Sequence, residues 1–296
     1  MKLYVGVTDF GWFDFLRRRQ PDEVNFWRPT VTHRFAALQP GEMFLFKPHA
    51  PRNFIVGGGV FSRYSTLPLS VAWSVFSYEN GVDSFEDFLG KIRWYQRGSA
   101  VAGPQIGCIV LEQPFFLPDD EWIPWPHNIG QQGKTYEAEE GLGRDLWQRL
   151  QGSWAAATEE DTDGPRGYWG RQLRRAGQND FRVAVIEAYG RQCAVTQEHT
   201  LPVLEAAHIR PFAEDGPHDV NNGLLLRTDV HKLFDLGYAT VDEHYRFVVS
   251  GHLRDEWNNG KDYYRRHGSP IVLPSSPTDR PSQEYLEWHR TNVFIA

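Results

Sequence analysis

Residues 204–237 have the sequence LEAAHIRPFAEDGPHDVNNGLLLRTDVHKLFDLG, which indicates how the C-terminal half is built. A short apolar strand is expected to end near His208, before a loop that contains Pro and Gly. A helix is expected near Thr228–Asp235. His231 and Asp235 are four residues apart, so they share one face of that helix and can contact one cation. The strand can bring His208 to the same place from the opposite side.

This set of side chains has a clear chemical use. A neutral histidine can accept a proton, and the ordinary pKa of about 6.5 allows that state at cellular pH. A mixed histidine and carboxylate site suits Mg²⁺, Mn²⁺, Ni²⁺ or Zn²⁺ without selecting among them. The sequence therefore predicts a proton acceptor beside one divalent metal ion.

The stretch resembles the HNH, or ββα-metal, nuclease family over roughly residues 178–250, in the variant that carries AHI, NGLLL and HKLFD. The resemblance implies hydrolysis of DNA phosphodiester bonds. His208 matches the general base, and Asn222 matches the residue that orients its imidazole through a backbone or side-chain bond. His231 matches the metal-binding histidine, and Asp235 occupies the second ligand position on the helix.

One position departs from the family pattern. Many relatives carry Asp or His directly before the base as a further metal ligand, and this chain carries Ala207 there. Glu205 lies two residues earlier and points to the same side of a strand, so it is a candidate replacement ligand. Water is the alternative. The departure also keeps open a non-catalytic, nucleic-acid-binding protein whose nuclease site has decayed.

Several further polar residues surround this stretch. Arg210 and Lys232 are candidate contacts to the DNA backbone, as are Arg174 and Arg175 from a short basic run. For all four, a solvated surface is the alternative. Neighbouring side chains have simpler expected roles: His199 and His218 as loop histidines, and Asp229 as a helix cap.

The N-terminal part has a different pattern. Short runs of β-branched and aromatic residues are bounded by Gly and Pro, and a helix is expected over 84–95. These features predict a small barrel-like α+β domain. Residues 23–65 resemble the PUA-like superfamily, especially EVE-type domains, through a "GE" turn between strands and a second strand marked by Gly57–Gly59. The predicted fold class of the chain is thus α+β, with a PUA-like β-barrel domain, flanking helices and a C-terminal ββα-metal domain.

The PUA-like resemblance implies a pocket that holds a base flipped out of the duplex. Such a pocket needs aromatic planes for stacking and polar groups for the edge of the base. Each ring below could equally belong to the core. The candidate planes are Trp12, Phe26 and Trp27, and the candidate polar groups are Asp9, Asn25 and Ser77.

A base-recognition domain joined to an HNH domain resembles the modification-dependent restriction endonucleases. The resemblance implies cleavage of double-stranded DNA that contains 5-methylcytosine or 5-hydroxymethylcytosine. Because each active site cuts one strand, a homodimer is expected. The alternative is an HNH nuclease that recognises a phosphorothioate backbone or an unmodified sequence.

The boundaries of these parts follow from composition. We expect a recognition domain over 1–150, a linker over 151–177 and a nuclease domain with a C-terminal extension over 178–296. The expected elements of the last part are a helix from Asn179 or Asp180 to Tyr189, strands 193–196 and 203–209, a helix around 255–267 and an amphipathic segment over 282–294.

Whole-chain composition excludes some classes of protein. The chain has 296 residues and a formal net charge of −7, so only a local basic face can serve DNA binding. Its two cysteines exclude a disulfide framework and a four-cysteine zinc site. The start lacks the pattern of a secretory signal, and no apolar run is long enough to span a membrane. A cytoplasmic protein without a membrane partner is expected.

Overall fold

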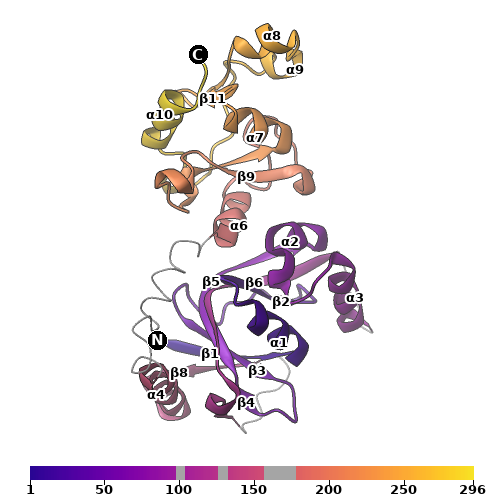
Figure 1. The fold of residues 1–296 in the computed structure, drawn as a ribbon, viewed down its shortest axis with the longest axis vertical. Coiled ribbons are helices and arrows are strands. Elements are labelled where there is room, and N and C mark those ends of the chain that lie inside the picture. Colours follow the sequence, from indigo (N-terminus) through magenta and orange to yellow (C-terminus); the bar gives the residue numbers. More distant parts are fainter. Residues whose placement is uncertain (98–103, 126–132, 157–177) are drawn as a thin grey trace. The chain divides into compact units, whose positions relative to one another are not determined.

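The computed structural model describes residues 1–97, 104–125, 133–156 and 178–296. The chain divides into two compact units, Met1–Asn179 and Asp180–Ala296 (Figure 1). Helix α4 continues to Ala156, through the first residues of the predicted linker. The rest of that linker, with Arg174 and Arg175, lies outside the described residues.

The first unit is built on a six-stranded sheet. Its strand order is β2-β6-β5-β3-β1-β8, and all neighbours are antiparallel except β1 and β3. The strands are β1 (Lys2–Thr8), β2 (Glu23–Arg28), β3 (Met43–Pro48), β5 (Gly57–Pro68), β6 (Gln105–Phe116) and β8 (Lys134–Glu137), and a separate pair is formed by β4 (Phe54–Ile55) and β7 (Ile123–Pro124). In the described part of the chain β2 and β8 are the two edges, so the ladder does not close into the predicted barrel.

Both faces of this sheet are covered, because successive side chains of β3 pack into different buried clusters. Phe44 and Phe46 pack into one buried cluster with α1, whereas Leu45 packs into a second cluster with α4. This is the two-residue period of a strand. The helices of the unit are α1 (Phe10–Arg19), α2 (Leu69–Phe76), η1 (Ser77–Asn80), α3 (Phe85–Gln96), η2 (Asp119–Glu121) and α4 (Gly141–Ala156). The α+β class predicted from the sequence is confirmed.

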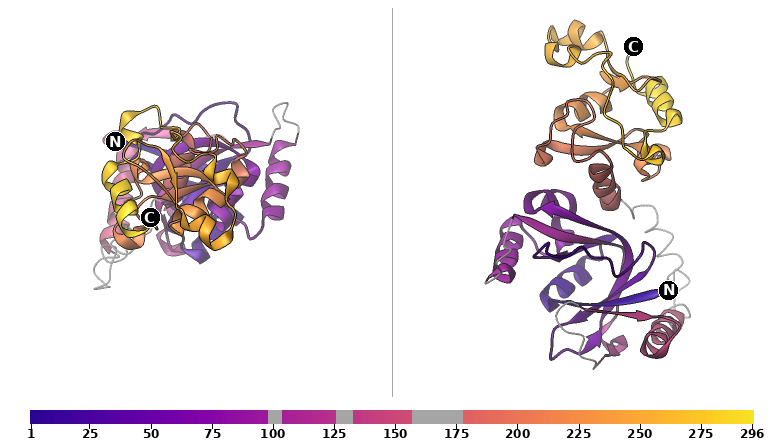
Figure 2. Two further views of the ribbon diagram at one scale, coloured as in Figure 1. Left: turned by 90° about the horizontal axis from the view of Figure 1, so that it is seen from above. Right: turned by 180° about the vertical axis from the view of Figure 1, so that it is seen from behind.

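The second unit is made of short elements around two strand pairs, β9 with β10 and β11 with β12 (Figure 2). Helix α7 lies next to the first pair, and α10 contacts β11. The strands are β9 (Leu204–His208), β10 (Gly223–Arg227), β11 (Ala239–Val241) and β12 (Phe247–Val249). The helices are α6 (Gln178–Ala188), η3 (Leu201–Val203), η4 (Phe212–Glu214), η5 (Val220–Asn222), α7 (Thr228–Asp235), α8 (His252–Trp257), α9 (Lys261–Tyr264), η6 (Pro277–Asp279) and α10 (Gln283–Asn292).

Two sequence predictions in this unit are corrected. Residues 193–196 form a turn, closed by Gln197 N–H donating to the Cys193 carbonyl, and the strand that pairs with β9 is β10. The helix expected over 255–267 is two short helices, because Asn258 and Gly260 both adopt left-handed backbone angles between them.

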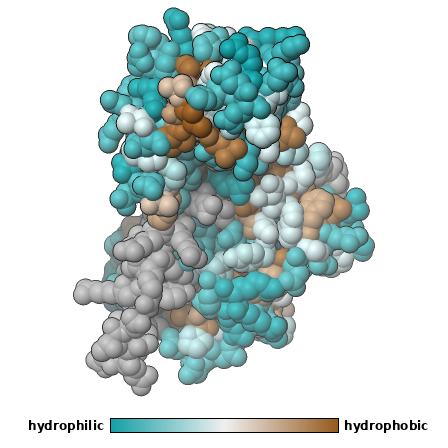
Figure 3. All heavy atoms as spheres, turned by 45° about the horizontal axis from the view of Figure 1, so that its top comes forward, coloured by the Kyte–Doolittle hydropathy of each residue, from teal (hydrophilic) through white to brown (hydrophobic). Residues whose placement is uncertain are grey.

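Hydrophilic residues cover most of the face shown in Figure 3, with smaller hydrophobic clusters among them. No helix within the described ranges has the length and apolar character needed to cross a membrane.

Candidate active site

The strands and helix of the predicted stretch form one continuous framework. β9 and β10 pair in antiparallel register, with His208 opposite Gly223 and Glu205 opposite Leu226. Helix α7 starts directly after β10, so its first turns lie beside the strand that carries Glu205. The local order is strand, strand, helix, and it places side chains of β9 and α7 at one surface.

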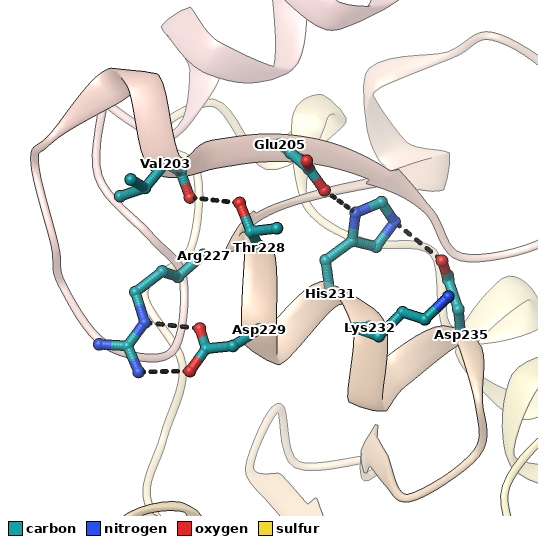
Figure 4. Close-up of a pocket in the computed structure, with 8 residues that line it drawn as sticks. All are labelled: Val203, Glu205, Arg227, Thr228, Asp229, His231, Lys232 and Asp235. Carbon is teal, nitrogen blue, oxygen red and sulfur yellow. Dashed lines mark hydrogen bonds and ion pairs between the residues drawn. The ribbon is translucent and has the colours of Figure 1, made fainter.

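His231 of α7 lies between two carboxylates (Figure 4). Its Nδ1 is 2.7 Å from Oε2 of Glu205, and its Nε2 is 3.3 Å from Oδ2 of Asp235. Burial lowers the pKa of His231, but the two carboxylates outweigh burial, and the pKa is raised above its ordinary value. Both carboxylates reach solvent, with Glu205 41% and Asp235 52% exposed.

These three side chains have the donor chemistry of a divalent-metal site. They line a pocket of about 910 Å³, and one imidazole with two carboxylates suits the ions predicted from the sequence. Within the described residues, however, no three His, Cys, Asp or Glu side chains are arranged to hold an ion together. The two imidazole nitrogens contact carboxylates instead. The residues thus fit a metal ion by chemistry, and one of the present contacts would be exchanged when an ion binds.

His208, at the end of β9, is enclosed by aromatic rings. Phe181 of α6 stacks on its imidazole, with ring centroids 3.9 Å apart and planes at 17°. Nε2 of His208 is 3.0 Å from Nδ1 of His218. Burial, reinforced by the nearby His218 and His231, lowers the pKa of His208 to about 4. The ring is therefore neutral at cellular pH, as a general base must be.

The charges of His231 and Asp235 also contribute to the pKa of His208, in opposite directions and less than burial and His218 do. The contact with His218 was not expected from the sequence, where His218 has the pattern of an ordinary loop histidine. No periodic pattern in the sequence could have predicted this contact, because it depends on how the loop between β9 and β10 folds.

Asn222 is fully buried and fastens the loop that follows His208. Its Oδ1 accepts from the Arg210 N–H at 2.9 Å, and its Nδ2 donates to the carbonyls of Arg210 and Pro217 at 2.9 and 2.8 Å. Its backbone carbonyl accepts from Ile209 N–H. These bonds fix the backbone next to His208; the predicted orienting role would thus act through the loop.

We expect Asn222→Ala to lower the free energy of unfolding of the second unit by about 2–4 kcal/mol, because it leaves partly buried backbone groups of Arg210 and Pro217 without these partners. Urea unfolding followed by circular dichroism measures the change. An exposed-site control, Asn259→Ala, should lose less stability. If the free energy of unfolding fell equally little in both variants, Asn222 would not hold the loop in place.

The other basic candidates lie around this surface in different ways. Lys232 lines the same pocket as His231, whereas Arg210 donates to the Glu214 carbonyl and lies 5.7 Å from the ring of Trp288. Asp229 is not a cap of its own helix: it forms a two-point ion pair with Arg227, 2.6 and 2.7 Å long.

Helix α7 is held from behind by a buried histidine of α10. The ring of His289 stacks on Phe234, with centroids 3.7 Å apart, and its Nε2 lies 3.1 Å from the Phe234 carbonyl. A carbonyl can only accept, so Nε2 carries the proton, and Nδ1 accepts from the Thr240 hydroxyl at 2.9 Å. Phe234 lies between His231 and Asp235 in sequence, so this clamp fixes the turn that carries both.

Burial lowers the pKa of His289 to about 4, against an ordinary value of 6.5. A depressed folded-state pKa gives stability that is complete above about pH 6.5 and is lost as the pH falls toward 4. The expected loss is roughly 2–3 kcal/mol. Unfolding of His289→Gln should show a smaller loss of stability between pH 7 and pH 4.5 than the unchanged chain. Parallel losses in the two proteins would contradict this.

The first unit carries a separate aromatic pocket of about 580 Å³. Four of the predicted base-pocket residues line it: Asp9, Trp12, Phe26 and Trp27. The sequence did not indicate the other lining groups, which include Tyr4, Arg28, His49, Trp94 and Tyr95. Trp94 and Tyr95 come from α3, so only the tertiary fold brings them to the strand residues.

The electrostatics of the pocket centre on Asp9. This residue caps α1 by accepting from Gly11 N–H, and its carboxylate is 2.6 Å from Nζ of Lys91. Burial acts to raise the pKa of Asp9, but these partners outweigh burial and lower the pKa. Asp9 is therefore an anion that accepts hydrogen bonds.

Two predicted pocket residues lie elsewhere, which corrects the sequence prediction. Asn25 is fully buried, and its Nδ2 donates to Oδ1 of Asn80 at 2.9 Å. Ser77 is exposed, and its carbonyl accepts from Asn80. Neither lines the pocket. Asn25 and Trp27 are two residues apart on β2 and both form hydrogen bonds with Asn80, but Asn25 is fully buried and its amide is used by that contact, so it does not reach the pocket.

The second unit contains a segment that matches a known protein family. The family model described as HNH endonuclease matches residues 193–242, which include His208, Asn222, His231 and Asp235. The predicted resemblance to the HNH endonucleases is confirmed. We refer to residues 193–242 as the HNH segment.

Solved structures with a likeness to the chain were also found. An ASCH protein from Zymomonas mobilis is 12% identical, with a TM-score of 0.34, and the match covers 51% of this chain and 94% of that one. The modification dependent TagI restriction endonuclease is 13% identical, with a TM-score of 0.30, over 98% of this chain and 81% of that one. No curated protein matches the sequence.

Proposed function

We propose that this chain is a metal-dependent endonuclease that hydrolyses DNA phosphodiester bonds. The observation that carries the proposal is the family match over residues 193–242, which contains His208 at the end of β9 and the contacting pair His231 and Asp235 on α7. His208 is neutral, and His231 is held between carboxylates on a surface open to solvent. A proton acceptor beside cation donors is what hydrolysis of a phosphodiester requires.

In this proposal His208 accepts a proton from water, and the water oxygen attacks phosphorus. The bond from phosphorus to O3′ breaks and the departing O3′ takes a proton from solvent water, which leaves 5′-phosphate and 3′-hydroxyl ends. His231 and Asp235 would hold one divalent ion, which when bound neutralises charge on the phosphate and the departing oxygen. Sequence and donor chemistry admit Mg²⁺, Mn²⁺, Ni²⁺ or Zn²⁺.

The role of Glu205 is refined by its contact. Its carboxylate lies on Nδ1 of His231, the nitrogen on the β9 side, and not beside Asp235. A carboxylate on the second nitrogen of a metal-binding histidine commonly fixes the ring and raises its basicity. We therefore propose that Glu205 orients His231 rather than replacing the ligand missing at Ala207.

For the first unit we propose recognition of a modified cytosine, 5-methyl- or 5-hydroxymethylcytosine, flipped into the aromatic pocket. The support is its volume, which suits a small flat ligand, and its lining by Trp27 and Phe26 beside the Asp9 carboxylate. An anion at this place can accept from the exocyclic amine of cytosine. Trp12 is only 2% exposed, so Trp27 is the better stacking plane.

Matched plasmids test the proposal: unmodified, cytosine-methylated, hydroxymethylated and phosphorothioated, each incubated with the protein and Mg²⁺ or Mn²⁺. Cleavage restricted to base-modified plasmids is expected. Equal cleavage of every plasmid, or of the phosphorothioated one alone, would instead support a nuclease that recognises sequence or backbone. Binding without cleavage in any metal would support a decayed site.

We expect Trp27→Ala to reduce the preference for modified plasmid by roughly tenfold or more, because base stacking contributes about 1–3 kcal/mol. The readout is the ratio of cleavage rates on modified and unmodified DNA. The control is Trp257→Ala, which removes an exposed tryptophan of the other unit. An unchanged ratio in Trp27→Ala would place recognition elsewhere.

We also propose that two copies act together, since a duplex has two strands and each chain carries one such centre. Gel filtration with and without DNA is expected to show a dimer in at least one state. A monomer both with and without DNA would exclude the proposed dimer.

A further inference from the structure

The strongest cluster that the family pattern does not explain is the pair of imidazoles at the end of β9. Nε2 of His208 and Nδ1 of His218 are 3.0 Å apart, a normal hydrogen-bond length. Phe181 stacks on the first ring, and Phe212 stacks on the second with centroids 4.8 Å apart and planes at 5°. Each histidine is thus fixed by its own aromatic partner.

We propose that His218 is a positioning residue for His208: it accepts a hydrogen bond from Nε2 of His208, so that Nδ1 of His208 is the nitrogen that takes the proton from water. This inference rests on the proposed nuclease function.

The contact between the two rings allows only certain protonation states. After His208 accepts a proton, both of its nitrogens carry N–H groups and can only donate. The bond to His218 therefore persists through the reaction only if Nδ1 of His218 is an acceptor. That requires a neutral His218 with its own proton on Nε2. Burial lowers the pKa of His218, although the nearby Asp219 acts to raise it. The lowered pKa favours the neutral ring.

The same contact selects the reactive nitrogen. With Nε2–H of His208 donating to His218, the lone pair of the neutral ring is on Nδ1. In the described residues no group forms a hydrogen bond with that nitrogen. The proton leaves water for Nδ1, the Nε2–H bond stays intact, and the bond to His218 becomes charge-assisted and stronger. His218 would do for His208 what a carboxylate does in many histidine bases, without adding negative charge next to the phosphate.

Two variants and a matched control test the role. We expect His218→Ala to lower kcat for plasmid nicking by roughly tenfold to hundredfold, a typical effect of removing a partner that orients a site histidine, with KM for DNA little changed. His218→Gln should recover most of the rate, because its amide oxygen can accept the same bond. His199→Ala removes an exposed loop histidine and should cleave normally.

A second readout needs no catalysis. In ¹⁵N-histidine NMR, the His208 signals, identified by their loss in His208→Ala, should show the proton on Nε2 in the unchanged chain and a mixture of tautomers in His218→Ala. Wild-type kcat in folded His218→Ala, or a His208 proton on Nδ1 in the unchanged chain, would overturn the proposal. If the unchanged chain cleaves no DNA, the nuclease function fails, while the NMR result still decides the histidine pair.

Discussion

Replacing His208 by alanine is expected to lower the rate of DNA cleavage by roughly 10²- to 10⁴-fold, the usual contribution of a general base. The reason is the environment of this imidazole. Burial lowers its pKa to about 4, so the ring is neutral and has a lone pair available for a proton, and the stacked Phe181 holds its plane. Single-turnover nicking of a modified plasmid measures the effect.

DNA binding provides the control for this variant. His208 is one partly buried ring, and the proposed phosphate and base contacts come from other residues, so affinity measured by gel shift should change little. His199→Ala, at an exposed loop position, should retain full cleavage. Full activity of His208→Ala would remove His208 from the chemistry, and loss of binding together with cleavage would point to a damaged fold.

The second large effect is expected at His231. We expect His231→Ala to reduce cleavage roughly 10²- to 10³-fold, because an ion at the phosphate contributes several kcal/mol and each 1.36 kcal/mol is tenfold in rate. The variant also leaves Glu205 and Asp235 as two carboxylates without the imidazole that separates them. A chelator added to the unchanged chain should give a comparable loss.

Metal binding itself separates this prediction from a general loss of structure. Isothermal titration with Mn²⁺ should show clearly weaker binding in His231→Ala than in Asp262→Asn, which changes an exposed carboxylate of α9. Glu205→Gln is expected to have an intermediate effect, since it weakens the contact that orients His231 without removing the ring. Equal Mn²⁺ affinity in all of these proteins would place the metal outside this pocket.

The features that sequence could predict are the local ones. His231 and Asp235 are one helical turn apart, and the structure has their Nε2 and Oδ2 atoms 3.3 Å apart. The apolar run before His208 gives β9, and residues 193–242 match the HNH endonuclease family model. In these cases the spacing along the chain fixes the spacing in space.

The features that escaped prediction depend on distant parts of the chain. His218 meets His208 because Asn222 folds the intervening loop back onto Arg210, and the loop has no periodic pattern that reveals this. Asn25 points to Asn80, a residue of η1 whose position only the packed sheet defines. Residues 193–196 are expected as a strand because their composition is apolar, but they form a turn, and composition alone does not separate a strand from an apolar turn.

One measurement tests the centre of the account most directly. Crystals of His208→Ala with Mn²⁺ and cognate DNA, analysed by anomalous scattering at the manganese edge, would locate the ion. We expect one peak bonded to His231 and Asp235, with the phosphate between it and residue 208. A peak at another place, or a phosphate far from either side of this pocket, would contradict the proposed nuclease centre.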